Sequence, residues 1–599
     1  MLPDTKTVNR RTIAILLGIL LTALAVRLGG LAGLSDSLYF KHLLWDEQMY
    51  HQWATAVAAG DPGAGSLYDQ APLPAYLLAA IYTLFSPDPL YFRLANIVFG
   101  VATCFFLYLV GKRLGGPAAG LLSCGLAALY GPFILYSIVP LKTSLAICLF
   151  SIFMAIVATS PENQPVKTLS VRLFFLGLTL GLAAAVRSNT LILILFIFPY
   201  LGYIYRGRSS FKRYLGGLAI FLVGLLLALS PFILKNYSAA GNLSSASSQF
   251  GRNLYYGNGP ENDTPYYRPM PFASSVPGES SVQFVIEASR RTGRDLSPEE
   301  SSSFWTQEVI QYIKNHPVSW GKRIQQKIFA VANGFEAGDH YNISFLATQI
   351  PFFALPFPGY AFVFALGLAG LFITWTSSRL IRLTAVPFVL YGLSLVIFYV
   401  GARYRLPLTV ILVPWAAAGT VHFFRYLQEK KFLLITLYLL IVGTSFLLTQ
   451  LPVKGAGDLT AYYNTQAFLL NAENREKEAI KYWEESVRLD GAFSAPARLF
   501  LAGKYYQNGD RERAYQTILG IPDTSFAAFS KYSLLGDLFA YEGKNEAAIE
   551  AYENSLSLNA GQRRIRRELI NFYFKNEKRK EDAFSQYEDL KRIESFFAD

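Results

Sequence analysis

The sequence predicts an all-α fold, a polytopic membrane helical bundle of about 11–13 spans followed by a C-terminal α-solenoid. Three observations indicate it. Of the 599 residues, 52% are apolar and only 16% are charged, whereas soluble domains carry about a quarter charged residues. Apolar runs of about 17 to 24 residues, long enough to span the hydrocarbon of a bilayer, recur up to residue 450. Beyond residue 458 the sequence is charged and repetitive instead.

Eleven apolar runs are candidate spans: 12–34, 90–111, 117–138, 141–159, 171–186, 189–205, 215–234, 351–374, 383–400, 406–424 and 432–450. The first follows Arg10 and Arg11 but is too long for a signal-peptide core, so we expect a retained anchor. From a cytoplasmic N-terminus, alternation places the basic residues of each short loop, such as Lys112 and Arg113, inside, as the positive-inside rule requires. A stretch at 73–86 is either a twelfth span or a helix lying in the interface.

Charge and cysteine content exclude several classes of protein. The net charge is +12, but the excess bases lie in short loops beside apolar runs, so no nucleic acid is expected as a partner. Cys104, Cys124 and Cys148 all lie within apolar runs, which predicts neither a disulfide framework nor a zinc cluster. The five histidines show no metal-ligand spacing, and no nucleotide-binding glycine loop is present. We therefore expect no metal and no cofactor.

The spans define the predicted domains. Residues 1–451 form the membrane domain, with outer loops at 35–88 and 235–350, and residues 458–599 form a separate extracytoplasmic domain. Within the longer loop, Ser297 and Pro298 followed by two glutamates are typical of a helix start. Two amphipathic helices, near 298–315 and 317–332, are expected to follow.

The C-terminal domain contains an internal repeat. Its marker is a small residue followed four positions later by a large apolar one: Ala479 with Trp483, Ala514 with Ile518, Ala548 with Tyr552 and Ala583 with Tyr587. The alanines are 35, 34 and 35 residues apart. This period is typical of tetratricopeptide repeats, which stack into a solenoid that binds a protein partner. An ordinary helical bundle is the alternative.

The first outer loop contains the segment "LLWDEQMYHQWATAVAAGD". Read as a helix, Trp45, Met49, Trp53 and Val57 form one apolar stripe, the pattern of a helix lying in the membrane interface. Asp46 flanks this stripe and Glu47 lies nearly opposite it. A carboxylate at this boundary meets both lipid and water, which makes Asp46 a candidate catalytic base with Glu47 as a helper. The alternative is that both acids solvate the outer surface or cap a helix.

Cations also gather on the outer side, where membrane topology does not require them. They are Arg93, Arg187, Lys235, Arg403 and Arg405. Ionisable groups at membrane depth are costly and therefore suggest function. Arginine matches phosphate oxygens with paired donors, so this group predicts a site for a lipid-borne phosphate. For any single member, a snorkelling side chain or a helix-end ion pair is the alternative.

Several motifs, in this order, resemble one family. They are "WDE", "APLPAYLLAAIYTLF", "RLANIVFGVATCFFLYLVGKRLGG", "LYGPFILYSIVPLKTSL", "AAAVRSNTLILILFIFP", "SPFILKNY", "FGRNLYYGNGP" and "ARYRLPLTVILVPW". Together they look like the membrane glycosyltransferases of the C fold, in the dolichyl-phosphate-mannose protein mannosyltransferase-like group that includes glycosyltransferase family 39. The resemblance implies that Asp46 deprotonates the acceptor and that Arg93, Arg187, Arg403 and Arg405 bind the phosphate of a polyprenyl-phosphate sugar.

The sequence departs from this group at one point. Members often carry a second acid in the next outer loop, but no Asp or Glu occurs between Arg113 and Glu162. Glu336 or Asp339 is a possible substitute. Otherwise the role is dispensable or the activity is lost.

The predicted function is transfer of a sugar from a polyprenyl-phosphate donor to a protein, lipid or glycan acceptor on the extracytoplasmic face of a bacterial inner membrane. Because the lipid phosphate is a good leaving group, such chemistry needs a base, cations and a site open to lipid. The alternatives are a non-catalytic membrane scaffold of a cell-envelope complex, a transporter or flippase, and an oligosaccharide ligase.

Overall fold

The computed structural model describes residues 10–61, 70–160, 166–205, 210–240, 248–274, 277–338, 340–576 and 579–598. Regular structure in these ranges is helical, with no strand among them, which confirms the all-α prediction. The chain forms two compact units. Unit 1 contains Met1–Leu243 and Ile324–Val453, and unit 2 contains Ser244–Arg323 and Lys454–Asp599.

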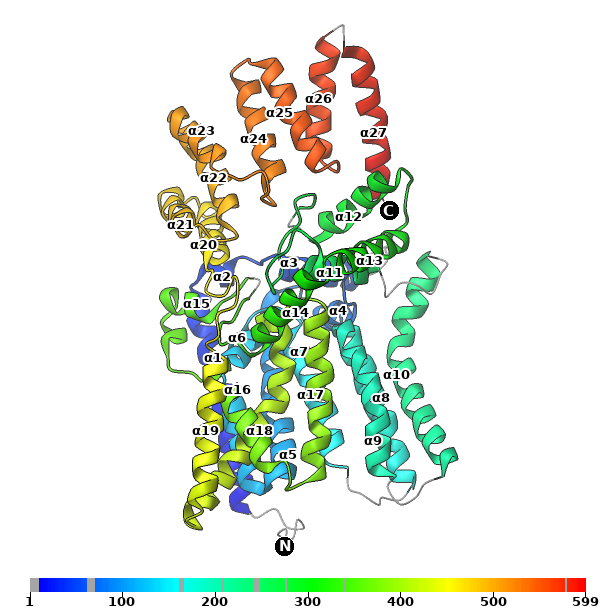
Figure 1. The fold of residues 1–599 in the computed structure, drawn as a ribbon, viewed down its shortest axis with the longest axis vertical. Helices are drawn as coiled ribbons and strands as arrows, with labels where there is room; N and C mark the ends of the chain where they lie inside the picture. Colours follow the sequence, from blue (N-terminus) through cyan, green and yellow to red (C-terminus); the bar gives the residue numbers. More distant parts are fainter. Residues whose placement is uncertain are drawn as a thin grey trace. The chain divides into compact units, whose positions relative to one another are not determined.

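Unit 1 holds the apolar helices (Figure 1). In chain order its elements are α1 (Arg10–Ser35), α2 (Leu38–Lys41), α3 (Asp46–Ala58), α4 (Leu73–Leu84), α5 (Pro89–Leu129), α6 (Gly131–Ile138), α7 (Thr143–Ala158), α8 (Val166–Val186), the 3-10 helix η1 (Ser188–Phe196), α9 (Ile197–Ile204), α10 (Phe211–Ala240), the end of α14 (Pro317–Ala332), α15 (Ile343–Gln349), η2 (Pro351–Ala354), α16 (Tyr360–Thr374), α17 (Arg379–Ile397), α18 (Ala402–Gln428) and α19 (Phe432–Leu448).

Six helices of the described chain are long and apolar enough to cross a membrane, namely α1, α5, α8, α10, α17 and α18. Shorter apolar helices, α7, η1 with α9, α16 and α19, coincide with further predicted spans. The chain is thus a polytopic all-α membrane protein, as predicted. Helix α4 has 12 residues, or about 18 Å of length, too short to cross about 30 Å of hydrocarbon. Of the two alternatives left open for 73–86, this length favours the helix lying in the interface.

Helix α5 is a hairpin of two antiparallel halves. Its helical dihedrals break before Gly116, which has φ 87° and ψ −178°, a conformation that favours glycine. A Cβ atom on Gly120 would lie 2.9 Å from the carbonyl oxygen of Tyr108, so the two halves are in direct contact. The hairpin contains the predicted span 90–111 and the first part of 117–138, which ends early because the helix stops at Leu129.

Prolines shorten another predicted span. The run 351–374 becomes α-helical only from Tyr360, because Pro356 and Pro358 each lack the N–H that a helix interior requires. Only a short 3-10 turn, η2, forms before them.

Arg27 is a buried cation within α1 that the charge analysis did not consider. Its guanidinium donates to Ser137 Oγ at 3.2 Å and to the carbonyl oxygens of Ala128 at 3.3 Å and Ala127 at 3.4 Å. It also donates to Ala23 of its own helix. The last carbonyls of a helix have no partner within that helix. Arg27 thus caps the end of α5 and ties α1 to the corner between α5 and α6.

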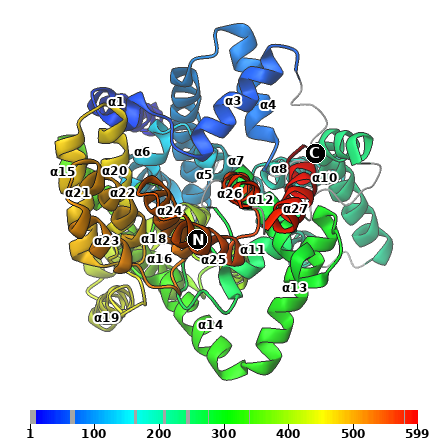
Figure 2. The ribbon, with the colours of Figure 1, turned by 90° about the horizontal axis from the view of Figure 1, so that it is seen from above.

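Helices α3 and α4 lie side by side (Figure 2) and share an apolar cluster built around Tyr50. The predicted stripe is only partly correct. Trp45 precedes the helix, with φ 36°, and is 39% exposed. Met49, Trp53 and Val57 do share a face, and they are partly buried against the cluster with α4.

Unit 2 begins with α11 (Ser248–Asn258), α12 (Pro277–Thr292) and α13 (Pro298–Asn315). The predicted start of α13 is confirmed as a capping box, in which Ser297 Oγ accepts from Glu300 N–H and the Glu300 carboxylate accepts from Ser297 N–H. The bounds of α13 and α14 match the predicted amphipathic helices.

The remaining helices of unit 2 pair in sequence order, α20 with α21, α22 with α23, α24 with α25 and α26 with α27. They are α20 (Thr460–Ala472), α21 (Glu476–Leu489), α22 (Ser494–Gln507), α23 (Arg511–Leu519), α24 (Ala528–Tyr541), α25 (Asn545–Leu558), α26 (Arg563–Lys575) and α27 (Lys580–Ala598). The four repeat alanines are fully buried, and of the large residues only Tyr587 is exposed. The assignment to tetratricopeptide repeats stays a prediction.

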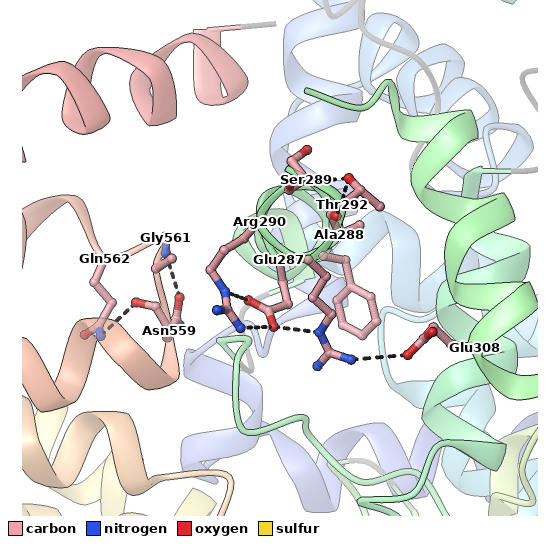
Figure 3. Close-up of polar contacts among 12 residues, drawn as sticks. Glu287, Ala288, Ser289, Arg290, Thr292, Glu308, Asn559, Gly561 and Gln562 are labelled. Atoms are coloured by element: carbon pink, nitrogen blue, oxygen red, sulfur yellow. Dashed lines mark hydrogen bonds and ion pairs between the residues drawn. The ribbon is translucent and has the colours of Figure 1, made fainter. Parts of the chain in front are cut away.

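The outer loop contributes to unit 2, which differs from the predicted domain 1–451. Buried Glu287 of α12 accepts from Arg290 and Arg291, and Arg291 also reaches Glu308 on α13 (Figure 3). A Cβ atom on Gly561, before α26, would lie 2.9 Å from the side chain of Gln283. Helix α12 therefore packs against the repeat helices. No local sequence pattern predicts this contact between distant segments.

Candidate active site

The candidate site lies where the ends of four helices of unit 1 converge. Asp46 is the first residue of α3, and Arg403 is in the first turn of α18. Arg187 directly follows α8, and Lys142 directly precedes α7. The structure thus brings together three residues that the sequence analysis singled out and one, Lys142, that it missed.

Asp46 and Arg403 form a buried ion pair. Arg403 Nη1 donates to Asp46 Oδ2 at 2.9 Å, and the two side chains are only 9% and 11% exposed. Burial alone would raise the pKa of Asp46, but Arg403, Lys142 and His340 outweigh it and lower the pKa to about 2. The carboxylate is therefore ionised and can accept a proton.

Lys142 completes the positive side of the site. Its Nζ donates to Tyr50 Oη at 3.0 Å and to Gln70 Oε1 at 3.4 Å. The charges of Asp46, Arg403 and Arg187 all act on the same Tyr50 hydroxyl, so these groups surround it. The signal that would have found Lys142 was present in the sequence, because the predicted topology places it beside an outer loop, where no cation is required.

Arg187 has unused donors. It is 5% exposed, donates from Nη2 to Thr143 Oγ1 at 3.3 Å, and interacts with the Tyr391 hydroxyl. Its Nε and Nη1 have no hydrogen-bond partner among the described residues. Its guanidinium carbon lies 4.9 Å from the centre of the Tyr404 ring, and that of Arg403 lies 5.2 Å from the same ring. A buried donor without a partner is costly, so Arg187 is a candidate for binding a ligand.

Together these groups make a positively charged cluster, the candidate anion site. Within the described residues, Lys142, Arg187 and Arg403 carry three positive charges against the single negative charge of Asp46. No side chain caps the N-terminus of α7 beside Lys142, and helix N-termini attract anions. Arginine binds phosphate through paired donors. The arrangement suits a phosphate next to a carboxylate base.

Glu47 is fully buried and is held by other partners. Its carboxylate accepts from Tyr341 Oη at 2.6 Å and from Leu44 N–H at 3.0 Å. Burial raises its pKa to about 7, although both hydrogen bonds and the charge of Arg93 oppose the rise. The alternative that Asp46 and Glu47 solvate the surface is thus wrong, because both are buried.

Two predicted phosphate ligands are bound to protein carbonyls instead. Arg93 donates to the carbonyls of Tyr39 and Phe40. Arg405 donates to the carbonyls of Ala330, Asn333 and Phe335, and it lies 3.9 Å from the centre of the Tyr360 ring. Both residues are bonded to backbone carbonyls, and their role in phosphate binding stays a prediction.

The other predicted residues lie outside the cluster. Lys235 on α10 donates to Tyr76 Oη on α4. Glu336 is half-buried, and burial raises its pKa to about 6 while Arg405 opposes the rise. Asp339 lies outside the described residues.

The fold and the site together are those of a polytopic membrane protein with a buried acid–cation cluster. Residues 69–234 match the family model described as dolichyl-phosphate-mannose-protein mannosyltransferase. This match confirms the family resemblance from the segment before α4 into α10. No curated protein matches the chain.

Solved structures similar to this chain include those of an archaeal oligosaccharyltransferase and of ArnT. The archaeal oligosaccharyltransferase AglB from Archaeoglobus fulgidus, in complex with an inhibitory peptide and a dolichol-phosphate, is 11% identical, with 80% of this chain and 60% of that chain covered and a TM-score of 0.40. The chain therefore spans about 60% of the length of that protein. ArnT from Cupriavidus metallidurans, bound to undecaprenyl phosphate, is 16% identical, with 68% and 77% covered and a TM-score of 0.32.

Proposed function

We propose that the chain is a membrane glycosyltransferase that moves one sugar from a polyprenyl-phosphate donor to a hydroxyl of a protein, lipid or glycan acceptor. The observation that carries this proposal is the buried cluster of Lys142, Arg187 and Arg403 around Asp46. The family match over residues 69–234 supports glycosyl transfer as the reaction class.

In this reaction the acceptor oxygen bonds to the anomeric carbon of the sugar as its proton passes to Asp46. The bond between that carbon and the phosphate oxygen breaks, and the electron pair leaves with the phosphate. Lys142, Arg187 and Arg403 stabilise the negative charge that develops there. General bases and preorganised charges each contribute large factors to such reactions.

The proposal is tested with purified full-length protein in lipid nanodiscs. We expect it to consume a mannosyl- or glucosyl-polyprenyl phosphate and to release the polyprenyl phosphate, either to a peptide or glycan acceptor or slowly to water. Consumption of a pyrophosphate-linked oligosaccharide alone would identify an oligosaccharide ligase instead. Absence of binding to any of these lipids would favour the scaffold, because the anion site would then serve another purpose.

We further propose that the N-terminus is cytoplasmic and that the helices after Val453 lie outside the cytoplasm of a bacterial inner membrane. The proposal rests on the positive-inside distribution of the short loops. A reporter active only in the cytoplasm, fused after Asp599, should be silent, whereas the same reporter fused after Arg425 should be active. Activity at the C-terminal fusion would reverse the proposed orientation of the tail.

A further inference from the structure

The residues before Asp46 form a closed turn. Leu44 N–H donates to Glu47 Oε2 at 3.0 Å, and Glu47 N–H donates to Leu44 O at 2.7 Å. Between them Trp45 has φ 36° and ψ −101°, a region that a bulky residue occupies only when its surroundings impose it. The Glu47 carboxylate therefore closes the turn that sets the direction of Asp46.

A second segment holds that carboxylate from the other side. Tyr341, 2% exposed, donates its hydroxyl to Glu47 Oε1, and its ring packs 5.7 Å from that of Tyr39. The preceding residue, His340, helps to lower the pKa of Asp46, and its ring lies 6.4 Å from that of Trp45. Residues 340 and 341 thus reach the acid pair that α3 presents.

We propose that Tyr341 is a positioning residue: it fixes the Glu47 carboxylate, which holds the 44–47 turn so that Asp46 faces Arg403. This inference rests on the proposed function for its kinetic consequences. Glu47 touches neither donor nor acceptor in this scheme. Efficient transfer then requires the segment before α15, which contains Tyr341, to remain packed on α3.

The hydrogen bonds select one protonation state of Glu47. Each oxygen accepts a hydrogen bond from a donor, which suits the carboxylate rather than the acid. The charged or titratable groups that face it are Asp46, Arg93 and Tyr341. Because burial raises the pKa of Glu47 to about 7, the turn is fully held above that pH and loosens as the pH falls through it.

The test compares Tyr341→Phe with Tyr200→Phe. Tyr200 is equally buried and donates to Ser160 at 2.7 Å, just beyond the end of α7 opposite Lys142. We expect Tyr341→Phe to lower kcat by about 10- to 100-fold, the scale of a small misplacement of a reacting group, with an unchanged KM for the donor. The hydrogen bond from Tyr341 lowers the pKa of Glu47, so its loss raises that pKa. The acid limb of kcat should therefore also move to higher pH. Tyr200→Phe should behave as wild type.

Glu47→Gln and hydrogen exchange complete the test. Glu47→Gln should remove the acid limb near pH 7, because no group of the turn then titrates there. Amide exchange of the peptide containing residues 44–47 should be faster in Tyr341→Phe, a readout that does not need transfer activity. Unchanged kcat, pH profile and exchange in Tyr341→Phe would overturn the positioning role. A wild-type protein without transfer activity contradicts the proposed function instead, and exchange then decides on Tyr341 alone.

Discussion

Replacing Asp46 by Asn lowers the rate of sugar transfer by about a hundred- to ten-thousand-fold, the usual cost of removing a general base, while donor binding remains. Asparagine keeps the size of the side chain but cannot take a proton from the acceptor hydroxyl. It also frees Arg403 from its ion pair at 2.9 Å, so donor affinity should stay equal or increase. Single-turnover transfer and equilibrium donor binding, measured on the same preparation, separate the two effects.

We expect the ion pair to make the base strength of Asp46 depend on whether the donor is bound. While Arg403 is bonded to Asp46, the pKa of the carboxyl is about 2 and the carboxylate is a weak base. A donor phosphate that shares Arg403 weakens this pairing and adds a negative charge nearby, so the pKa of Asp46 must rise. We therefore expect Asp46 to become a stronger base when the donor is bound.

Glu336→Gln is the matched control for Asp46→Asn. Glu336 is another acid of unit 1, and the charge that acts on it is that of Arg405 rather than those of the anion site. We expect its substitution to leave transfer near the wild-type rate. Equal losses in both variants would restore Glu336 as the second acid, and a wild-type rate in Asp46→Asn would refute the base assignment.

Replacing Arg187 by Ala weakens donor binding by about 10- to 100-fold, the value of about 1.5 to 3 kcal/mol for a hydrogen bond to a charged group. The reason is that its Nε and Nη1 have no partner in the described protein and are the donors most available to a phosphate. Arg187→Lys should be intermediate, because it keeps the charge and loses the paired geometry.

The control for Arg187→Ala lies on the same helix. Arg172 donates to Ser160 at 3.2 Å, near the opposite end of α8 from Arg187. Isothermal titration with a short-chain polyprenyl-phosphate sugar should show a loss in Arg187→Ala and none in Arg172→Ala. Equal affinity in wild type and Arg187→Ala would reduce Arg187 to a structural residue.

Sequence patterns predicted the features that depend on neighbouring residues, such as helices and their starts. Apolar runs gave most helices of unit 1, and the capping signal at Ser297 located α13. The sequence analysis treated Arg403 and Arg405 alike, although residues two positions apart on a helix point in directions about 200° apart. Helical geometry therefore allows only one of them to face Asp46, and the structure shows that it is Arg403.

These patterns could not predict contacts between segments that are distant in the sequence. Tyr341 meets Glu47 across 294 residues of chain, and this contact decides the surroundings of the acid. The positive φ of Trp45 likewise depends on the closed turn, so the stripe expected from helical spacing starts one turn late. The packing of α12 on the repeat helices has the same origin in tertiary structure.

The surroundings of Arg27 bear on how the protein is made. Its partners Ala127, Ala128 and Ser137 lie 100, 101 and 110 residues further along the chain. A ribosome that has just released α1 has not yet synthesised them, and a central arginine costs about 2.5 to 3.5 kcal/mol on insertion scales. Helix α1 therefore lacks most of the partners of Arg27 until α5 and α6 have been translated, and we expect its integration to become more stable at that point.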